Sequence, residues 1–313
     1  MIFYDPIIQN LIHDSFCTLD ILRLDLIDKE ISGNKWFKLK RNLERAKSEN
    51  FETIITFGGS FSNHIAATAA ACKRYNLKCI GIIRGEQKEE SNPTLNQAKK
   101  NGMLLHFVNR EFYAHKNENS FKGYLENNFG KHYLIPEGGN NAEGILGSGE
   151  ILKPDWHYDY IFCACGTGTT YAGLKAAKQN SQKIIGISVL KGENKLSAEI
   201  EKLLHSIFPE EKIKIDGNEI LEKHFVEEDC IVNSYAFKGY AKLDSFLLAF
   251  KKEFESLYKI PLDHVYTTKL LFAVFDLIQK NKLKPKAKAL VIHSGGLQGN
   301  RGFEERYHLI PNL

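Results

Sequence analysis

Residues 160–177 read YIFCACGTGTTYAGLKAA, and this stretch joins an apolar run to a glycine-rich turn and then to a helical pattern. The run over 160–165 lacks polar alternation, which is typical of a strand covered on both faces. The turn over 166–170 follows, and residues 171–179 predict a helix. In open α/β sheets ligands bind where such strands end. The stretch therefore predicts an α/β fold with a ligand site at the carboxyl end of this strand.

The same unit of strand, polar turn and helix recurs along the chain. We predict further strands at 53–57, 79–83, 103–108, 183–189 and 289–293, and further helices at 62–75, 94–101 and 267–280. Strands that alternate with helices in this way form parallel sheets. The alternation of Leu22, Leu24 and Leu26 with polar residues predicts, in addition, an antiparallel strand at a sheet edge.

The length of 313 residues suits one large domain or two ordinary ones. We predict two open, mostly parallel α/β domains. A smaller domain at 50–146 is inserted between two parts of a larger one, 1–49 and 147–313.

Composition excludes several classes of protein. Hydrophobic residues make up 43% and charged residues 26%, which is close to the globular average and unlike collagen, disordered chains or coiled coils. No apolar run approaches the roughly 20 residues needed to span a bilayer, and residues 1–6 lack the features of a secretory signal. The net charge of +4 is mild, and basic residues are mixed with acidic ones. We therefore expect a soluble cytoplasmic protein that binds neither nucleic acid nor membrane.

The cysteines are sparse and irregularly spaced, which indicates buried reduced thiols rather than a disulfide framework. They are Cys17, Cys72, Cys79, Cys163, Cys165 and Cys230. The pair Cys163 and Cys165 lies in an apolar strand with no second pair of ligands nearby. We therefore predict no metal site.

The turn after the strand at 160–165 consists of Gly166, Thr167, Gly168, Thr169 and Thr170. Backbone N–H groups and hydroxyls at the start of a helix form an anion site, and glycine allows a phosphate to approach closely. The motif is neither a P-loop nor Gly-x-Gly-x-x-Gly, so nucleotide binding is not indicated. An ordinary glycine turn with a threonine cap is the alternative.

A lysine stands near the start of another predicted helix. Trp36, Leu39 and Leu43 have helical spacing, so the helix begins near Asn34, which is a good cap. Lys35 then lies in the first turn, where the helix dipole disfavours a protonated amine. This suits a neutral, nucleophilic lysine of the kind used in Schiff-base chemistry, and a second lysine, Lys38, one turn later lowers the pKa further. The alternative is a pair of solvent-facing lysines.

A third cluster of polar residues lies at a strand-to-helix turn. Gly58, Gly59, Ser60, Phe61, Ser62, Asn63 and His64 bring a hydroxyl, an amide and an imidazole together. The turn could bind a carboxylate or a phosphate. It is not Gly-x-Ser-x-Gly, so a Ser-His-Asp triad is not predicted.

Taken together, these segments resemble the fold-type-II (tryptophan-synthase-beta-like) pyridoxal-phosphate enzymes, and more narrowly the 1-aminocyclopropane-1-carboxylate deaminase/D-cysteine desulfhydrase family. The Gly-Asn-Lys-x-x-Lys segment matches at Lys35, the Ser-Asn-His segment starts 27 positions later at Ser62, and a His-x-Gly-Gly segment starts at His293. The resemblance implies that Lys35 carries the cofactor and that Asn63 holds its 3′-oxygen. It also implies that Ser62 binds the substrate carboxylate and that the turn Gly166–Thr170 holds the phosphate.

Two tyrosines also match the family. Tyr240 and Tyr266 align with its active-site tyrosines, although either residue could be plain core. The deaminases carry glutamate after the second tyrosine, where it pairs with the pyridine nitrogen, whereas this chain has Thr267, as the desulfhydrases do. A neutral hydroxyl is a weaker partner for a protonated pyridine. The loop Pro136–Asn141 departs from the family pattern and leaves the substrate open.

The resemblance implies a homodimeric pyridoxal-phosphate-dependent lyase or deaminase, with the cofactor between the two domains. It would convert a small D-cysteine-like amino acid by β-elimination into a keto acid and ammonia. Lys35 would act as general base at Cα, and Tyr266 would protonate or deprotonate near Cβ. Three alternatives stay open: 1-aminocyclopropane-1-carboxylate deaminase, a cysteine-synthase or threonine-dehydratase type reaction, and a non-catalytic phosphate or amino-acid binding module.

Overall fold

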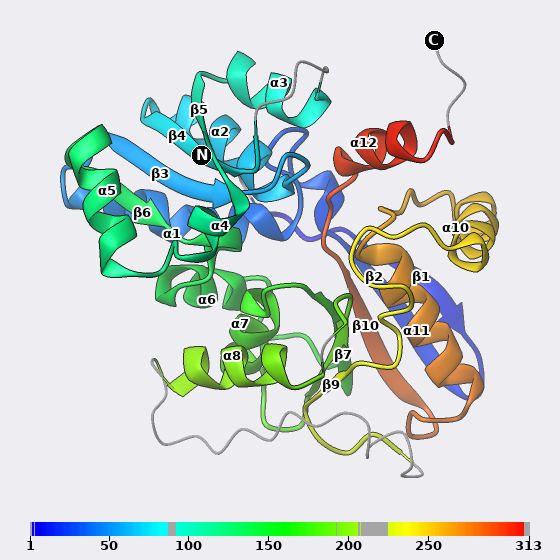
Figure 1. The fold of residues 1–313 in the computed structure, drawn as a ribbon. Helices are drawn as coiled ribbons and strands as arrows, with labels where there is room; N and C mark the ends of the chain where they lie inside the picture. The colour runs from blue at the N-terminus through cyan, green and yellow to red at the C-terminus, as the bar shows by residue number, and fades with distance from the viewer. Residues whose placement is uncertain are drawn as a thin grey trace.

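A computed structural model describes residues 2, 4–86, 92–191, 193–205, 207 and 225–309, and two sheets organise it (Figure 1). The larger sheet has the strand order β1-β2-β10-β7-β8-β9. Its strands are β1 (Ile8–His13), β2 (Cys17–Arg23), β7 (Tyr160–Cys165), β8 (Lys183–Ser188), β9 (Cys230–Val232) and β10 (Ala287–His293). Only the pair β1 and β2 is antiparallel; the other neighbours are parallel.

The smaller sheet has the order β5-β4-β3-β6 and is parallel throughout. Its strands are β3 (Thr53–Gly58), β4 (Lys78–Arg84), β5 (Met103–Val108) and β6 (Tyr133–Ile135). All of them fall between residues 53 and 135, whereas the larger sheet draws its strands from 8–23 and 160–293. This separation supports the division that we propose, with a small domain at 50–146 and a large one at 1–49 plus 147–313.

Helices cover both faces of each sheet. They are α1 (Asn34–Ser48), α2 (Asn63–Tyr75), α3 (Pro93–Lys100), α4 (Arg110–Ala114), α5 (Asn119–Phe129), α6 (Ala142–Gly149), α7 (Thr169–Ala177), α8 (Glu193–His205), α10 (Ser245–Tyr258), α11 (Thr267–Gln279) and α12 (Gly299–Arg306). On the larger sheet, α10 and α11 contribute to one core cluster, and α1, α7 and α8 contribute to the cluster on the other face. The predicted α/β class with mostly parallel sheets is confirmed, and the predicted element ends agree within about two residues.

The prediction for the N-terminal edge strand was wrong in two respects. The strand over Leu22 ends at Arg23, and Leu24–Leu26 forms a short 3₁₀ turn. The strand is also internal, because β1 pairs with one side of it and β10 with the other. Leu19, Ile21 and Leu22 are fully buried, so both faces of β2 are covered. The true edge, β1, is interrupted by a bulge between Asn10 and Ile12, which blurs its alternation.

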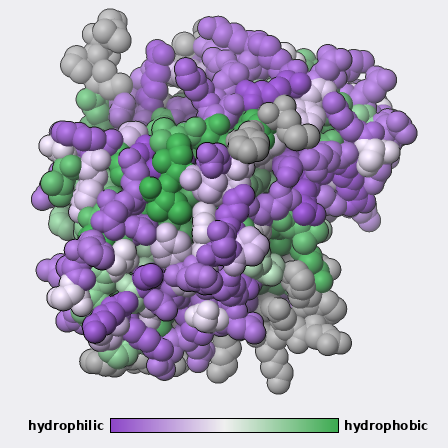
Figure 2. Space-filling model, turned by 180° about the vertical axis from the view of Figure 1, so that it is seen from behind, coloured by the Kyte–Doolittle hydropathy of each residue, from purple (hydrophilic) through white to green (hydrophobic). Residues whose placement is uncertain are grey.

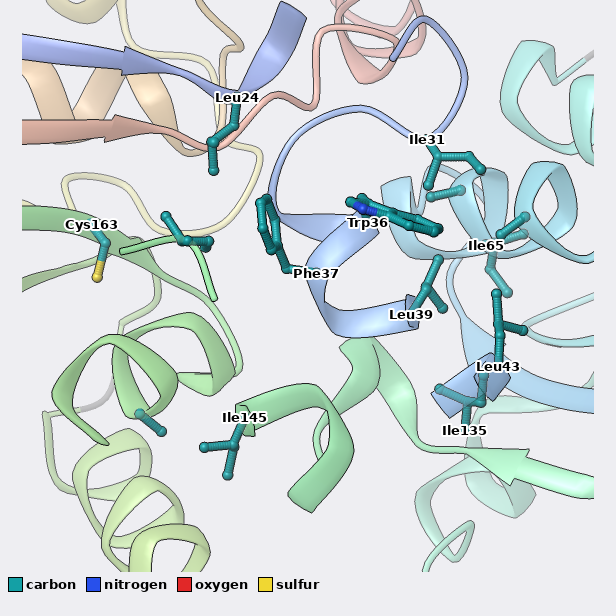
Figure 3. Close-up of a cluster of buried hydrophobic side chains, with 14 of the residues drawn as sticks. Leu24, Ile31, Trp36, Phe37, Leu39, Leu43, Ile65, Ile135, Ile145 and Cys163 are labelled. Atoms are coloured by element: carbon teal, nitrogen blue, oxygen red, sulfur yellow. The ribbon is translucent and has the colours of Figure 1, made fainter. Parts of the chain in front are cut away.

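Helix α1 lies between the two sheets and is fixed by packing on both sides. In Figure 3, Trp36, Leu39 and Leu43 reach toward Ile65 and Ile135 of the small domain, and Phe37 lies on the side of Leu24 and Cys163. Each such side chain, when fully buried, contributes about 1.5–3 kcal/mol. The helix that carries Lys35 is therefore fixed by buried contacts on both sides, between the two sheets.

The surface and the thiols agree with the composition. Seen from behind in Figure 2, the surface is mostly hydrophilic, and hydrophobic residues gather in a few small areas. Within the part of the chain that the structure describes, no helix is both long and apolar enough to cross a membrane. All six cysteines are buried free thiols, as predicted.

Candidate active site

The start of α1 is pinned to the segment that follows β10. Gly33 has φ +73°, and a Cβ atom there would lie 1.9 Å from the carbonyl oxygen of Ser294. The same oxygen accepts a hydrogen bond from the backbone N–H of Asn34, at 3.2 Å. Only glycine fits at position 33, because it combines a left-handed backbone with this close approach. The crossing places Lys35 in the first turn of α1, beside the carboxyl end of β10.

Asn34 was predicted to cap this helix, and that prediction was wrong. Gly33 occupies the capping position, and no side chain caps the helix. The amide of Asn34 instead bridges two parts of the site. Its Nδ2 donates to Thr170 Oγ1 at 2.8 Å, and its Oδ1 accepts from Lys35 Nζ at 2.7 Å. Asn34 thereby connects the lysine to the glycine-threonine turn.

Both lysines of the Gly-Asn-Lys-x-x-Lys segment are perturbed. Burial lowers the pKa of Lys35 to about 8, although the charge of Asp263 opposes this shift. Burial, followed by the charge of Lys35, lowers the pKa of Lys38 well below its ordinary value. The expected effect of one amine on the other is therefore present at Lys38 but not at Lys35, whose pKa is lowered by burial and not by Lys38. Lys35 has an appreciable fraction of neutral amine near neutral pH, as a nucleophile requires.

The glycine-threonine turn connects β7 to α7. Gly168 has φ +77° at the N-terminus of α7, and a Cβ atom there would lie 2.1 Å from Cγ1 of the buried Ile200. The hydroxyls of Thr167 and Thr169 are 2.9 Å apart, and Thr169 Oγ1 donates to Asn140 Oδ1 at 2.9 Å. The first N–H groups of α7 have no partners within the helix, so the turn can bind an anion.

The loop Pro136–Asn141, whose role the sequence left open, packs against this turn. A Cβ atom at Gly138 would lie 2.8 Å from the methyl carbon of Thr167, and one at Gly139 would lie 3.0 Å from Cβ of Lys38. The loop therefore joins the turn to α1.

The start of α2 carries unsatisfied polar atoms. Thr56 Oγ1 donates to the carbonyl of Ile135 at 2.8 Å, so at 2.9 Å it must accept from Nε2 of His64. Burial and the two lysine charges lower the pKa of His64 to about 3, so the ring is neutral and Nδ1 is an acceptor. Nδ1 of His64 and Oδ1 of Asn63 are buried without a partner among the described residues. Buried acceptors of this kind mark a place for a bound polar group.

Ser62 and Asn63 lie at the start of α2 and contact local neighbours. Ser62 Oγ caps α2 by accepting from the backbone N–H of Ile65 at 3.3 Å. Asn63 Nδ2 donates to the carbonyl of Gly296 at 3.4 Å. Neither side chain has a hydrogen bond to Lys35 or to the tyrosines among the residues described. Their common feature is the position at the carboxyl end of β3, next to the segment after β10.

The two predicted tyrosines lie together at the glycine-threonine turn. The rings of Tyr240 and Tyr266 pack edge to face, with centroids 6.1 Å apart. A Cβ atom at Gly166 would lie 3.1 Å from the ring of Tyr266, so this ring covers the turn. Burial raises the pKa of Tyr266 well above its ordinary value, and its phenol stays protonated at neutral pH. Tyr240 is 47% exposed.

Thr267 takes part in a cap that involves a residue the sequence reasoning missed. Its hydroxyl donates to Asp263 Oδ2 at 2.7 Å and accepts from the backbone N–H of Asp263 at 2.7 Å. The carboxylate of Asp263 also accepts from the backbone N–H groups of Val265, Tyr266 and Thr267.

The candidate site contains no obvious metal centre. Across the described ranges, no group of three or more His, Cys, Asp or Glu side chains is arranged to hold a metal ion.

Comparison with known proteins identifies relatives of this chain. The family model described as "Pyridoxal-phosphate dependent enzyme" matches residues 23–295. A putative 1-aminocyclopropane-1-carboxylate deaminase of Pyrococcus abyssi is 30% identical, over 89% of this chain and 84% of the relative. A bifunctional mitochondrial D-cysteine desulfhydrase/1-aminocyclopropane-1-carboxylate deaminase of Arabidopsis thaliana is also 30% identical, over 89% of this chain and 72% of the relative. The crystal structure of an ACC deaminase homologue superimposes with a TM-score of 0.78 at 25% identity, covering 99% of this chain and 95% of that one.

Proposed function

The chain belongs to the pyridoxal-phosphate-dependent enzymes, in the 1-aminocyclopropane-1-carboxylate deaminase/D-cysteine desulfhydrase family, and on that premise we propose that it degrades a small D-cysteine-like amino acid by β-elimination. The observation that carries the proposal is the convergence of one lysine, one anion-binding turn and one tyrosine pair. Asn34 bonds Lys35 to Thr170, and Tyr266 covers Gly166 in the same turn.

The residues at the site fit pyridoxal phosphate. Lys35 would bind it covalently, the turn Gly166–Thr170 would hold its phosphate, and Asn63 would hold its ring oxygen. The free N–H groups at the start of α7 and the buried, unpaired acceptor of Asn63 support these roles. When bound, pyridoxal phosphate supplies a sink for the electron pair left at Cα when a proton is removed.

Three side chains would bind the substrate and transfer its protons. The substrate amine would displace Lys35 from its covalent link, and the freed Lys35, as a neutral amine, would remove the Cα proton. Ser62 and the N–H groups at the start of α2 would hold the substrate carboxylate. Tyr266 is protonated at neutral pH and donates its proton to the departing sulfur, which leaves as hydrogen sulfide. Water then converts the released aminoacrylate to pyruvate and ammonia.

Thr267 supports elimination over opening of a cyclopropane ring. Asp263 is the nearby carboxylate, but its two oxygens already accept four local hydrogen bonds. The hydroxyl of Thr267 donates its own proton to Asp263 Oδ2, so toward a pyridine nitrogen it can only accept, through a remaining lone pair. A neutral acceptor of this kind stabilises a protonated pyridine less than a carboxylate does. A thiolate is a good leaving group, so its expulsion requires less stabilisation of negative charge by the cofactor than breaking a carbon–carbon bond does.

The test is a comparison of kcat/KM for D-cysteine and 1-aminocyclopropane-1-carboxylate. We expect the unaltered enzyme to prefer D-cysteine by roughly tenfold or more, and Thr267→Glu to narrow that ratio, because one partner hydrogen bond is worth about this much. Thr267→Ser, which keeps the hydroxyl, is the matched control and should retain the preference. If the unaltered enzyme prefers the cyclopropane substrate, the deaminase activity takes the place of elimination.

The perturbed lysine also predicts how cofactor capture depends on pH. Because the pKa of Lys35 is lowered to about 8, the neutral amine fraction rises with pH up to that value and then levels off. The rate at which apoprotein acquires the absorbance of bound pyridoxal phosphate should rise about tenfold per pH unit below pH 8. Stopped-flow spectroscopy measures this rate, and binding of pyridoxine 5′-phosphate, which lacks the aldehyde, serves as the control. A rate that still rises in this way up to pH 10 contradicts a lowered pKa.

Two broader features complete the proposal. The family resemblance supports a homodimer, which light scattering of the purified protein tests. The buried free thiols support a reducing compartment such as the cytoplasm.

A further inference from the structure

A buried lysine outside the predicted site joins three segments of the large domain. Lys269 is 2% exposed and lies in the first turn of α11, three residues after Tyr266. Its Nζ donates to the carbonyl oxygens of Ala236 at 2.8 Å, Gly239 at 2.8 Å and Val189 at 3.1 Å. An ammonium group has three N–H donors, so this hydrogen-bonding capacity is fully used.

The position is unfavourable for a lysine that serves only the helix. A cation near a helix N-terminus is opposed by the helix dipole, and burial lowers the pKa of Lys269 to about 8. At neutral pH the side chain is still protonated, and its partners are carbonyl groups rather than a carboxylate. The structural role of Lys269 is therefore to hold the backbone whose carbonyl groups it binds.

That backbone is strained around Tyr240. Phe237 and Ala241 have φ values of +52° and +48°, in the left-handed region that non-glycine residues seldom adopt. Such conformations persist only where the surroundings impose them. Lys269 holds the carbonyl of Gly239, which directly precedes Tyr240, and the hydroxyl of Tyr307 holds the carbonyl of Ala241, which directly follows it.

Among the described residues, the side chain of Tyr240 contacts Tyr266, and the loop backbone determines where that side chain lies. Its side chain is 47% exposed, and its ring contact is the edge-to-face pair with Tyr266. Tyr266 directly precedes α11, the helix that carries Lys269. The ring that packs on Tyr240 and the lysine that binds its loop therefore lie within one helical turn of each other.

We propose that Lys269 is a positioning residue that holds Tyr240 against Tyr266 by binding the carbonyls of Ala236, Gly239 and Val189. The inference rests on the proposed function, in which Tyr266 donates a proton to the departing sulfur, and it adds that Tyr240 must be held against Tyr266 for this step. It assigns no chemical step to Lys269 itself.

A direct test measures Tyr240 in the apoprotein. Nitration by tetranitromethane, followed by peptide mass spectrometry, reports the reactivity of each tyrosine. In Lys269→Met we expect nitration of Tyr240 to become at least about threefold faster relative to a peptide outside the loop, because the loop is released. The control is Lys251→Met, which removes a similarly buried lysine of α10 that pairs with Glu255. An unchanged rate at Tyr240 overturns the proposal.

A double-mutant cycle in the holoenzyme separates positioning from general stability. Lys269→Met and Tyr240→Phe should lower kcat for the preferred substrate by similar factors, and the double variant should be no slower than either single variant. If the decrease in kcat of the double variant equals the product of the decreases in the two single variants, the proposal is overturned. Where Lys269→Met does not accumulate in folded form, Lys269→Arg is used. Arginine keeps the charge, but its planar guanidinium cannot donate to all three carbonyl oxygens at once. The results for Lys269→Arg are interpreted in the same way as those for Lys269→Met. Nitration needs no substrate, so the nitration rates test the position of Tyr240 even if the elimination reaction is not observed.

Discussion

Replacing Lys35 with alanine is expected to lower kcat by roughly 10³-fold or more, because the variant loses both its covalent hold on the cofactor and the base at Cα. The residue lies in the first turn of α1, is hydrogen-bonded to Asn34, and has a pKa lowered to about 8, which supplies a fraction of neutral amine at physiological pH. Steady-state assays with D-cysteine, and the visible spectrum of the variant, measure the loss.

Peptide mapping identifies the lysine independently. Borohydride makes the link between lysine and pyridoxal permanent, and tandem mass spectrometry should find the adduct on Lys35. Lys40→Ala is the matched control: Lys40 lies on the same helix, pairs with Glu150 and should be replaceable with little effect. An adduct on Lys38, or a Lys35→Ala variant that stays active, would falsify the assignment.

Replacing Gly168 with alanine is expected to weaken cofactor binding by about 100-fold or more. The new Cβ atom would lie 2.1 Å from Cγ1 of Ile200, which is fully buried, so either the turn or the core around Ile200 has to move. A shift of the turn weakens phosphate binding, because each lost hydrogen bond to a charged phosphate costs about 1.5–3 kcal/mol. Titration of apoprotein with pyridoxal phosphate measures the change in affinity.

Gly130→Ala is the matched control for this variant. Gly130 has φ +68°, close to the +77° of Gly168, but open space surrounds its Cβ position. Gly130 has ψ −154°, in a region that is essentially restricted to glycine, whereas Gly168 has ψ −10°, in the left-handed region. Gly130→Ala therefore carries at least as much backbone strain, and only Gly168→Ala adds the collision. Equal cofactor affinity in the two variants would show that the turn does not hold the phosphate.

Much of the fold could be predicted because its parallel strands are continuous apolar runs. The strands β3, β4, β7 and β8 are covered on both faces, so the burial that stabilises them requires a continuous run of apolar residues that is visible in the sequence. The strands β6 and β9 have three residues each and are too short to show a pattern. The strand β1 is longer, but its bulge interrupts the alternation of buried and exposed residues, so it shows no clear pattern either.

The site was less accessible to prediction, because its contacts join distant parts of the chain. Asn34 has the composition of a cap, yet its amide binds Thr170, 136 positions away. Whether a side chain serves its own helix or a remote partner depends on tertiary packing, which local propensity does not contain. The roles of Asp263 and Lys269 follow from partners that only the folded chain brings into contact.

The place of β10 has a consequence for how the protein is made. This strand is the last one that the structure describes along the chain, but it lies in the middle of the larger sheet, paired with β2 on one side and β7 on the other. During synthesis, which runs from the N-terminus, β2 and β7 emerge from the ribosome long before the strand that joins them. Each then presents an unpaired edge, which is the kind of surface on which nascent chains aggregate.

The four-stranded sheet faces no such delay, since all its strands fall between residues 53 and 135. It can form while the remainder of the chain is still being translated. The close contact of Gly33 and Asn34 with the carbonyl of Ser294, here called the crossing, cannot form until translation has passed residue 294. A chain terminated before β10 would therefore contain every residue from Lys35 to Thr267 and still lack the crossing that seats Lys35 at the start of α1.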